Sequence, residues 1–252
     1  MLQTIPKRTD IFWTGGWDST FRIIQLLMTT DNVVQPHFII RDEGSTGIEI
    51  NAMNNIRRLI SREYASIFHR FLPTIYANAL LIEKDEGIAD EIEELIRDGK
   101  IIDPQYILMA NYCREFNINE IELGLEVYPG ESQQEFLDMH FGEATAFKCF
   151  RYPIFHLTKE DMLQIAKQND WVKILSLTSF CRKPLIKANA CGICGPCIDT
   201  VVAGLDFRLP YGSRIKARIQ KPFRVFWRNH YYKNQNNWFF KFVKSRLENT
   251  FL

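Results

Sequence analysis

The sequence feature that most constrains the fold is a strand, a glycine turn and a helix close to the N-terminus. A short and mainly apolar run at residues 10–13 ends at Thr14-Gly15-Gly16-Trp17-Asp18-Ser19-Thr20, and residues 21–27 continue with helical spacing. A helix that opens at such a turn directs its free N–H groups and the positive end of its dipole at the turn. The stretch therefore predicts a cradle for anionic oxygen.

The side chains of this turn are suited to holding phosphate. Gly15 and Gly16 carry no Cβ, so a phosphate can approach the main chain. The hydroxyls of Thr14, Ser19 and Thr20 are hydrogen-bond donors, and Asp18 is suited to holding a Mg²⁺ that bridges phosphate oxygens. The run matches neither G-x-x-x-x-G-K-[ST] nor G-x-G-x-x-G, so from the turn alone a plain strand-to-helix connection stays open as an alternative.

Strand and helix patterns alternate along the rest of the first 175 residues. We expect four further strands at 32–41, 74–82, 120–126 and 150–156, and helices at 48–68, 86–97, 104–116, from 133 and from 158. Pro36 indicates a bulge or an edge position for the second strand. Thr158 and Asp161 have the spacing of a capping box. The alternation predicts an α/β fold with a doubly wound, mainly parallel five-stranded sheet.

Four cysteines form a metal-binding pattern near the C-terminus. Cys181 is followed by nine residues and then by Cys191-Gly192-Ile193-Cys194-Gly195-Pro196-Cys197. Two-residue spacing lets successive thiolates face one ion, and four thiolates complete a tetrahedral, structural Zn²⁺ site. An iron–sulfur cluster and redox-active thiols stay open as alternatives. Cys113 and Cys149 lie in helix and strand patterns and are predicted to be buried apolar residues.

The charge of the chain is divided unevenly. From Phe207 to the end there are 11 Lys or Arg and one acid, a net charge of +10, whereas the rest carries 20 basic and 29 acidic residues, or −9. The basic residues of this tail are interleaved with aromatic ones. Such a segment suits packing within or between chains, nucleic-acid binding, or lying on an anionic membrane surface.

Three parts and one compartment are expected from these patterns. We expect an α/β domain at 1–175, a four-cysteine zinc subdomain at 176–209 and a basic, aromatic helical extension at 210–252. The N-terminus shows no signal-peptide pattern, and no apolar run reaches the roughly 20 residues that span a bilayer. A cytoplasmic protein is the corresponding expectation, since clustered cysteines there bind metal rather than form disulfides.

Two motifs together resemble a known family. The order hydroxyl-Gly-Gly-x-Asp-Ser at 14–19 is similar to the phosphate loop of the PP-loop ATP pyrophosphatases, with Thr14 in place of the usual serine. Among them, the 7-cyano-7-deazaguanine (preQ0) synthase family adds a late cysteine and a C-G-x-C-x-x-C knuckle, which Cys181 and residues 191–197 resemble. Residues 152–159 resemble the family's Pro-Leu-x-x-x-Thr-Lys segment. The resemblance covers residues 10–27 and 151–209.

The resemblance implies a reaction and its cofactors. In that family ATP adenylates a carboxylate or amide oxygen of 7-carboxy-7-deazaguanine, pyrophosphate and AMP leave, and ammonia supplies the nitrogen of the nitrile. The chain is then an ATP-dependent C–N ligase of queuosine biosynthesis that uses Mg²⁺ and a structural Zn²⁺, with a homodimer as one possible assembly. The loop residues Thr14 to Thr20 and Lys159 bind nucleotide, with Asp18, Ser19 and Lys159 as catalytic residues.

The segments expected to bind the acceptor depart from the family. Ile102-Asp103-Pro104-Gln105 stands in place of a Gly-Arg-Asn segment, and Tyr128-Pro129-Gly130-Glu131-Ser132 lacks the Asp-Cys-Arg of the family's substrate loop. The turn at 41–44 also differs. An intact ATP site with a changed acceptor site keeps two alternatives open. One is an enzyme that adenylates tRNA, protein or another small molecule, and the other is an inactive nucleotide-binding adaptor.

Overall fold

The computed structural model describes residues 6–41, 44–100, 102–126, 132–184 and 189–233. The chain divides into two compact units, with the division between Ser179 and Phe180. In the described residues, no helix has both the length and the apolar character that crossing a membrane requires.

A five-stranded parallel sheet forms the centre of the first unit. Its strands are β1 (Arg8–Phe12), β2 (Val33–Ile40), β3 (Ile75–Asn78), β4 (Ile121–Glu122) and β5 (Phe150–Arg151), arranged in the order β3-β2-β1-β4-β5. Every neighbouring pair is parallel. The predicted five-stranded parallel sheet is therefore confirmed.

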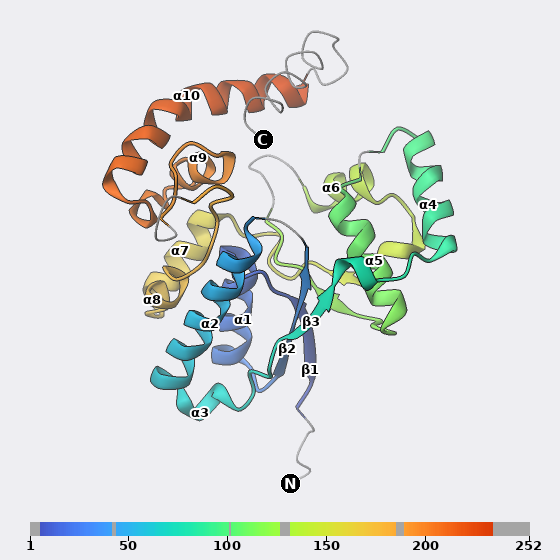
Figure 1. Cartoon of the computed structure of the whole chain (residues 1–252), viewed down its shortest axis with the longest axis horizontal. Coiled ribbons are helices and arrows are strands. Elements are labelled where there is room, and N and C mark those ends of the chain that lie inside the picture. The colour runs from blue at the N-terminus through green and yellow to red at the C-terminus, as the bar shows by residue number, and fades with distance from the viewer. Residues whose placement is uncertain (1–5, 42–43, 101, 127–131, 185–188, 234–252) are drawn as a thin grey trace. The chain divides into compact units, whose positions relative to one another are not determined.

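Helices cover both faces of this sheet (Figure 1). One face carries α1 (Trp17–Thr29), α2 (Thr46–Glu63), the short α3 (Ala65–Phe68), α7 (Lys159–Gln168) and α8 (Val172–Leu175). The other carries α4 (Glu86–Arg97), α5 (Pro104–Glu115) and α6 (Gln133–His140), with the 3₁₀ turns η1 (Ala79–Leu81) and η2 (Thr145–Phe147). A strand covered on both faces reads as a continuous buried run, as β2 does, and the doubly wound prediction is confirmed.

The edge prediction for Pro36 is wrong. β2 lies between β1 and β3, and Pro36 pairs in register with Ile11. Toward β3, however, the ladder begins only at His37, and before it there is a single bridge from Val34 to Phe71. Pro36 therefore lies at a gap in the pairing with β3, where a missing N–H removes no ladder bond.

The last three strands are shorter than their sequence patterns predict. After Asn78 the chain turns into η1, and β4 and β5 each keep only two residues in the ladder. The helix boundaries agree better, because their caps are local. Thr158 and Asp161 form the predicted capping box, and Asp103 caps α5 ahead of Pro104.

A buried polar chain fixes the middle of the sheet. His37 on β2 shares hydrogen bonds of 2.7 Å with Asp10 Oδ1 on β1 and with the Tyr112 hydroxyl on α5. Burial alone would raise the pKa of Asp10, but the hydrogen bonds from His37 and Arg8 outweigh it and hold the pKa below its ordinary value. Nearby, Cys113 is buried as predicted, whereas Cys149, for which burial was also predicted, is only partly buried.

The second unit is built around the cysteines. It contains α9 (Gly195–Val202), the 3₁₀ turn η4 (Asp206–Arg208) and α10 (Tyr211–Lys233). Its small core includes Ala217 of α10 and three of the four cysteines predicted to bind metal. A Cβ on Gly192 would lie 2.6 Å from Ser213 Cα, so the knuckle and the start of α10 are in direct backbone contact. Ion pairs join Arg224 to Asp199 and Arg218 to Asp206.

Candidate active site and metal centre

The strand order places the candidate site. The chain runs outward from β1 to β2 and β3, and then returns to pair β4 on the other side of β1. In open α/β sheets the crevice beyond the carboxyl ends of the strands at such a reversal is where ligands bind. The Thr14–Asp18 turn follows β1, and the segment Gly124–Glu126 follows β4. The structure therefore brings these two segments to one place.

Glycine is required at position 15 of the turn. Gly15 has φ +68°, and a Cβ there would lie 3.0 Å from the Glu49 carbonyl oxygen and 3.1 Å from Met53 Cγ of α2. Its own carbonyl accepts a 2.8 Å hydrogen bond from the amide of Ser179. Gly16, by contrast, has φ −76° and is the N-cap of α1. The turn is therefore held from both sides in one conformation.

The residues after the turn lie in the first turn of α1, but their side chains differ in direction. Asp18 is partly exposed, whereas Ser19 and Thr20 are buried. The Thr20 hydroxyl accepts a 2.9 Å hydrogen bond from the Trp13 indole N–H. The Thr20 side chain thus belongs to the core. Thr14 is half-buried and lines the pocket described below, and Asp18 is the partly exposed side chain in the first turn of α1.

Two of the predicted site residues meet above this turn. Lys159, the first residue of α7, has its Nζ 3.6 Å from Asp18 Oδ1 and also forms an ion pair with Glu126. The Asp18 Oδ1 atom is buried and has no hydrogen-bond partner among the described residues. Burial, together with the negative charge of Asp18, raises the pKa of Glu126 to about 7. One ammonium group is therefore shared by two carboxylates.

Glu126 is the site residue that sequence reasoning missed. A Cβ on Gly124 would lie 2.6 Å from Ser19 Cα, so the chain leaving β4 runs directly against the first turn of α1. Only glycine allows this approach, and it delivers the next side chains to the phosphate-loop region. The signal in the sequence was the Gly-x-Glu at the end of a predicted strand, beside the position where the strand order reverses.

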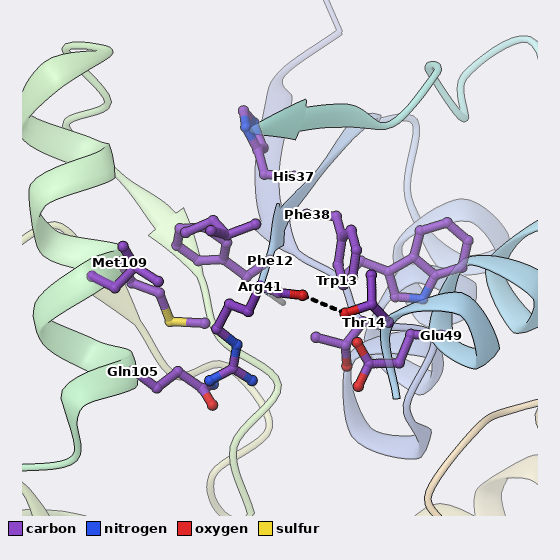
Figure 2. A pocket seen from close by; sticks show the side chains of 12 residues that line it. Phe12, Trp13, Thr14, His37, Phe38, Arg41, Glu49, Gln105 and Met109 are labelled. Carbon is purple, nitrogen blue, oxygen red and sulfur yellow. Dashed lines mark hydrogen bonds between the residues drawn. The ribbon is translucent and has the colours of Figure 1, made fainter. Parts of the chain in front are cut away.

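A pocket lies beside the turn at the carboxyl ends of β1 and β2 (Figure 2). Phe12, Phe38 and Met109 supply apolar walls, and Arg41 and Gln105 supply polar groups. The Thr46 hydroxyl donates a 2.6 Å hydrogen bond to the Arg41 carbonyl oxygen, which ties α2 to the end of β2. The cavity is narrow, with a volume of about 20 Å³, and six of its twelve lining residues are polar.

The four predicted metal ligands come together in the second unit. The Sγ atoms of Cys181, Cys191, Cys194 and Cys197 all lie within 4.8 Å of one another, with the closer pairs at 3.4, 3.8 and 3.9 Å. Tetrahedral zinc with bonds of about 2.3 Å separates its sulfurs by about 3.8 Å. The cluster therefore has the dimensions of a four-thiolate zinc site and could hold that metal.

The backbone around these sulfurs stabilises thiolate charge. The amides of Ile193 and Cys194 each donate to Cys191 Sγ at 3.4 Å, and the Cys191 amide donates to Cys181 Sγ at 3.3 Å. Burial raises the pKa of Cys181 to about 11, whereas the hydrogen bond between Cys194 and Cys197 lowers the pKa of Cys194 to about 4. Metal binding requires deprotonated thiols, and these amides favour them.

Parts of the expected acceptor site lie outside the described residues. Of Tyr128-Pro129-Gly130-Glu131-Ser132, only Ser132 is described, and it caps α6. Asp42 and Glu43 of the turn after β2 also fall outside. From the segment at 102–105, Asp103 caps α5 and Gln105 lines the pocket.

Comparison with known proteins agrees with the site. A search of curated proteins gives no match to the chain. A family model described as Queuosine biosynthesis protein QueC matches residues 11–203, which is more than half of the chain and runs from β1 through α9. That range includes the glycine turn, Lys159 and all four cysteines. The chain therefore belongs to the QueC family, an enzyme family of queuosine biosynthesis.

Proposed function

We propose that the protein is an ATP-dependent C–N ligase that adenylates a carboxylate of a 7-deazaguanine, forms the amide when ammonia displaces AMP, and then adenylates the amide oxygen, so that loss of a second AMP leaves the nitrile. The observation that carries this proposal is the meeting of Asp18 and Lys159 at the mouth of the Gly15-Gly16 turn. Anion-binding amides, a carboxylate and an ammonium group there form a complete set for a metal-bound triphosphate.

The residues present fit a magnesium-bound nucleotide. Asp18 Oδ1 is buried without a hydrogen-bond partner among the described residues, so it is available as a hard oxygen ligand. Gly15, with φ +68°, lets the turn bend against α2 and lead directly into the start of α1, whose first N–H groups have no partner within the helix. When bound, Mg²⁺ would be held by Asp18 and would neutralise charge on the phosphate oxygens.

The chain's own residues then act by positioning and electrostatics. The oxygen of the acceptor carboxylate attacks the α-phosphorus and pyrophosphate leaves, so negative charge grows on the leaving group. Amides of the first turn of α1 and the Lys159 ammonium group would donate hydrogen bonds to that charge. The planar base would bind next to the turn against Phe12 and Phe38, and the narrow pocket of Figure 2 would have to widen to admit it. No protein nucleophile is needed.

The test is a product assay. The zinc-loaded protein is incubated with ATP, Mg²⁺, ammonium and 7-carboxy-7-deazaguanine, and nucleotides and bases are separated by chromatography with mass detection. We expect AMP, pyrophosphate and the nitrile. AMP release that depends on a different added acceptor, such as tRNA, would show that the substrate is that acceptor. This is the main alternative to the proposal, because residues 102–105 differ from the family's pattern. Absence of AMP with every acceptor would leave a nucleotide-binding adaptor.

Ionised Glu126 is expected to lower the stability of the folded protein at high pH, although the residue supports turnover. Its pKa is about 7 in the folded protein against an ordinary 4.5, so between these values the folded state binds more protons than the unfolded state. Its contribution is therefore fully present below pH 4.5 and is lost as pH rises through 7. Replacing it with neutral glutamine removes that loss, and Glu126→Gln should be at least as stable as wild type at pH 8.

The same variant should lose activity about ten- to a hundredfold, because Lys159 loses its ion pair with residue 126 and is then misplaced for the phosphates. Denaturant titrations at pH 5 and pH 8 without Mg²⁺, together with steady-state kinetics, measure both effects. Glu122→Gln serves as the comparison, since its partner is Arg22 rather than Lys159. Equal stability losses at both pH values, or unchanged turnover, would contradict this assignment.

A further inference from the structure

The helix α10 lies beyond the residues that the family model matches, and one of its faces packs against the rest of the second unit. Ser213 and Ala217 are buried against the knuckle and α9, and Ala217 belongs to the cysteine core. Arg218 and Arg224 form ion pairs with Asp206 and Asp199 of the same unit. This contact fixes which side of the helix is turned outward.

The outward side carries an apolar stripe. Tyr211, Ile215, Ile219 and Phe223 recur at every fourth position and are exposed by 78 %, 42 %, 65 % and 75 %. Residues four apart lie on one face of a helix, and the stripe extends for about 18 Å at 1.5 Å per residue. Leaving four large apolar side chains in water over such a length is unusual for a surface without a partner.

The surroundings of the stripe are cationic. Between Tyr211 and Lys233 there are seven Lys or Arg and no acid. Lys216 is exposed beside the stripe and Lys221 is half-buried, and neither has an ion-pair partner among the described residues. The sequence after α10 continues in the same way, with Trp238, Phe239, Phe240 and Phe242 among further Lys and Arg.

The charge and polarity of this face indicate which kind of partner binds the stripe. Two such stripes from two copies would bring basic flanks beside basic flanks, which is repulsive. A nucleic acid supplies negative charge, but its bases bind through stacking faces that Ile215 and Ile219 do not offer. An anionic lipid surface supplies phosphate groups for the Lys and Arg side chains and an apolar layer for Ile and Phe. Trp and Tyr rings favour the same interface.

We propose that α10 is an interfacial anchor whose stripe Tyr211-Ile215-Ile219-Phe223 inserts into the surface of a membrane rich in anionic lipid. The helix lies in the plane of the interface and does not cross it. The proposal is independent of the reaction assigned to the first unit, since it concerns only residues 211–226.

The experiment is co-sedimentation of the zinc-loaded full chain with vesicles. Vesicles of phosphatidylcholine with phosphatidylglycerol are compared with phosphatidylcholine alone. We expect binding to the anionic vesicles that weakens as salt is raised. Ile219→Glu with Phe223→Glu should lower the partition coefficient at least about tenfold. Lys216→Glu, a surface change that leaves the stripe intact, should lower it roughly fivefold or more on anionic vesicles only.

A matched control keeps the comparison specific. Leu80 and Leu81 of η1 are also exposed, by 84 % and 74 %, so Leu80→Glu with Leu81→Glu introduces the same charge elsewhere and should bind as wild type does. Zinc content confirms that each variant is folded. The proposal is overturned by equal binding to neutral vesicles, by no binding, or by a stripe variant that binds normally. It is also overturned if the stripe variant converts a dimer to a monomer or abolishes binding of an RNA probe instead.

Discussion

Asp18→Asn is expected to lower kcat/KM for ATP about a hundred- to a thousandfold while the protein stays folded. Asparagine keeps the size of the side chain but removes its charge, and Asp18 Oδ1 is a buried carboxylate oxygen that lies 3.6 Å from Lys159 Nζ. Without that charge the metal would lose its carboxylate ligand, and the Lys159 ammonium group would lose one of its two carboxylate partners. Initial rates of pyrophosphate release at several ATP and Mg²⁺ concentrations measure the loss.

The control for this variant is Asp90→Asn. Asp90 is an exposed residue of α4, on the face of the sheet opposite α1, so its replacement should leave the rates unchanged. Excess Mg²⁺ should recover little of the Asp18→Asn activity, because the defect lies in the missing ligand. If Asp18→Asn retains most of the wild-type turnover, the glycine turn is not the triphosphate site. That conclusion does not depend on which metal the cysteines bind.

Removing one zinc ligand is expected to have the largest effect on stability. Cys197 is fully buried at the centre of the sulfur cluster, and structural zinc contributes on the order of 10 kcal/mol to small domains that depend on it. The second unit has only a small core apart from these cysteines. Cys197→Ser should therefore reduce bound zinc from one per chain to a fraction and unfold residues 180–233.

Metal analysis and hydrogen exchange measure these two outcomes. Exchange of the α9 and α10 amides should rise in Cys197→Ser and in wild type treated with a chelator, while the sheet amides of β1 and β2 stay protected. Cys149→Ser, which changes a half-buried cysteine outside the cluster, should keep its zinc. If the wild-type protein shows visible absorbance and contains stoichiometric iron, the four cysteines bind an iron–sulfur cluster and not zinc.

The features that sequence alone predicted well are those whose geometry is determined by a few residues that are close together in the sequence. The Gly-Gly turn, the capping box at Thr158 and the spacing of Cys191, Cys194 and Cys197 each act over two to six positions. Their geometry is set by local backbone preferences and by the reach of one side chain. The alternation of strand and helix patterns added the fold class, because a doubly wound sheet is the usual packing for such an alternation.

Sequence patterns could not show where a strand ends. The apolar alternation at 120–126 suggested a seven-residue strand, yet only Ile121 and Glu122 pair in the ladder. The chain leaves the sheet because Gly124 packs onto the backbone of Ser19, a residue about a hundred positions away. Likewise, the edge position expected for Pro36 was wrong because pairing with β3 happens to lapse at that residue.

The sequence by itself determined the chemical groups of this protein: a glycine turn at the start of a helix, a carboxylate, a lysine and four thiols. Only the tertiary structure decided that Glu126 shares the ammonium group of Lys159 and that Thr20 belongs to the core. It also decided that one face of α10 packs on the knuckle while the other is exposed. The physical reason is the range of the interactions. Helix caps and closely spaced cysteines involve neighbours in the sequence, whereas strand order and helix packing decide which distant side chains come into contact.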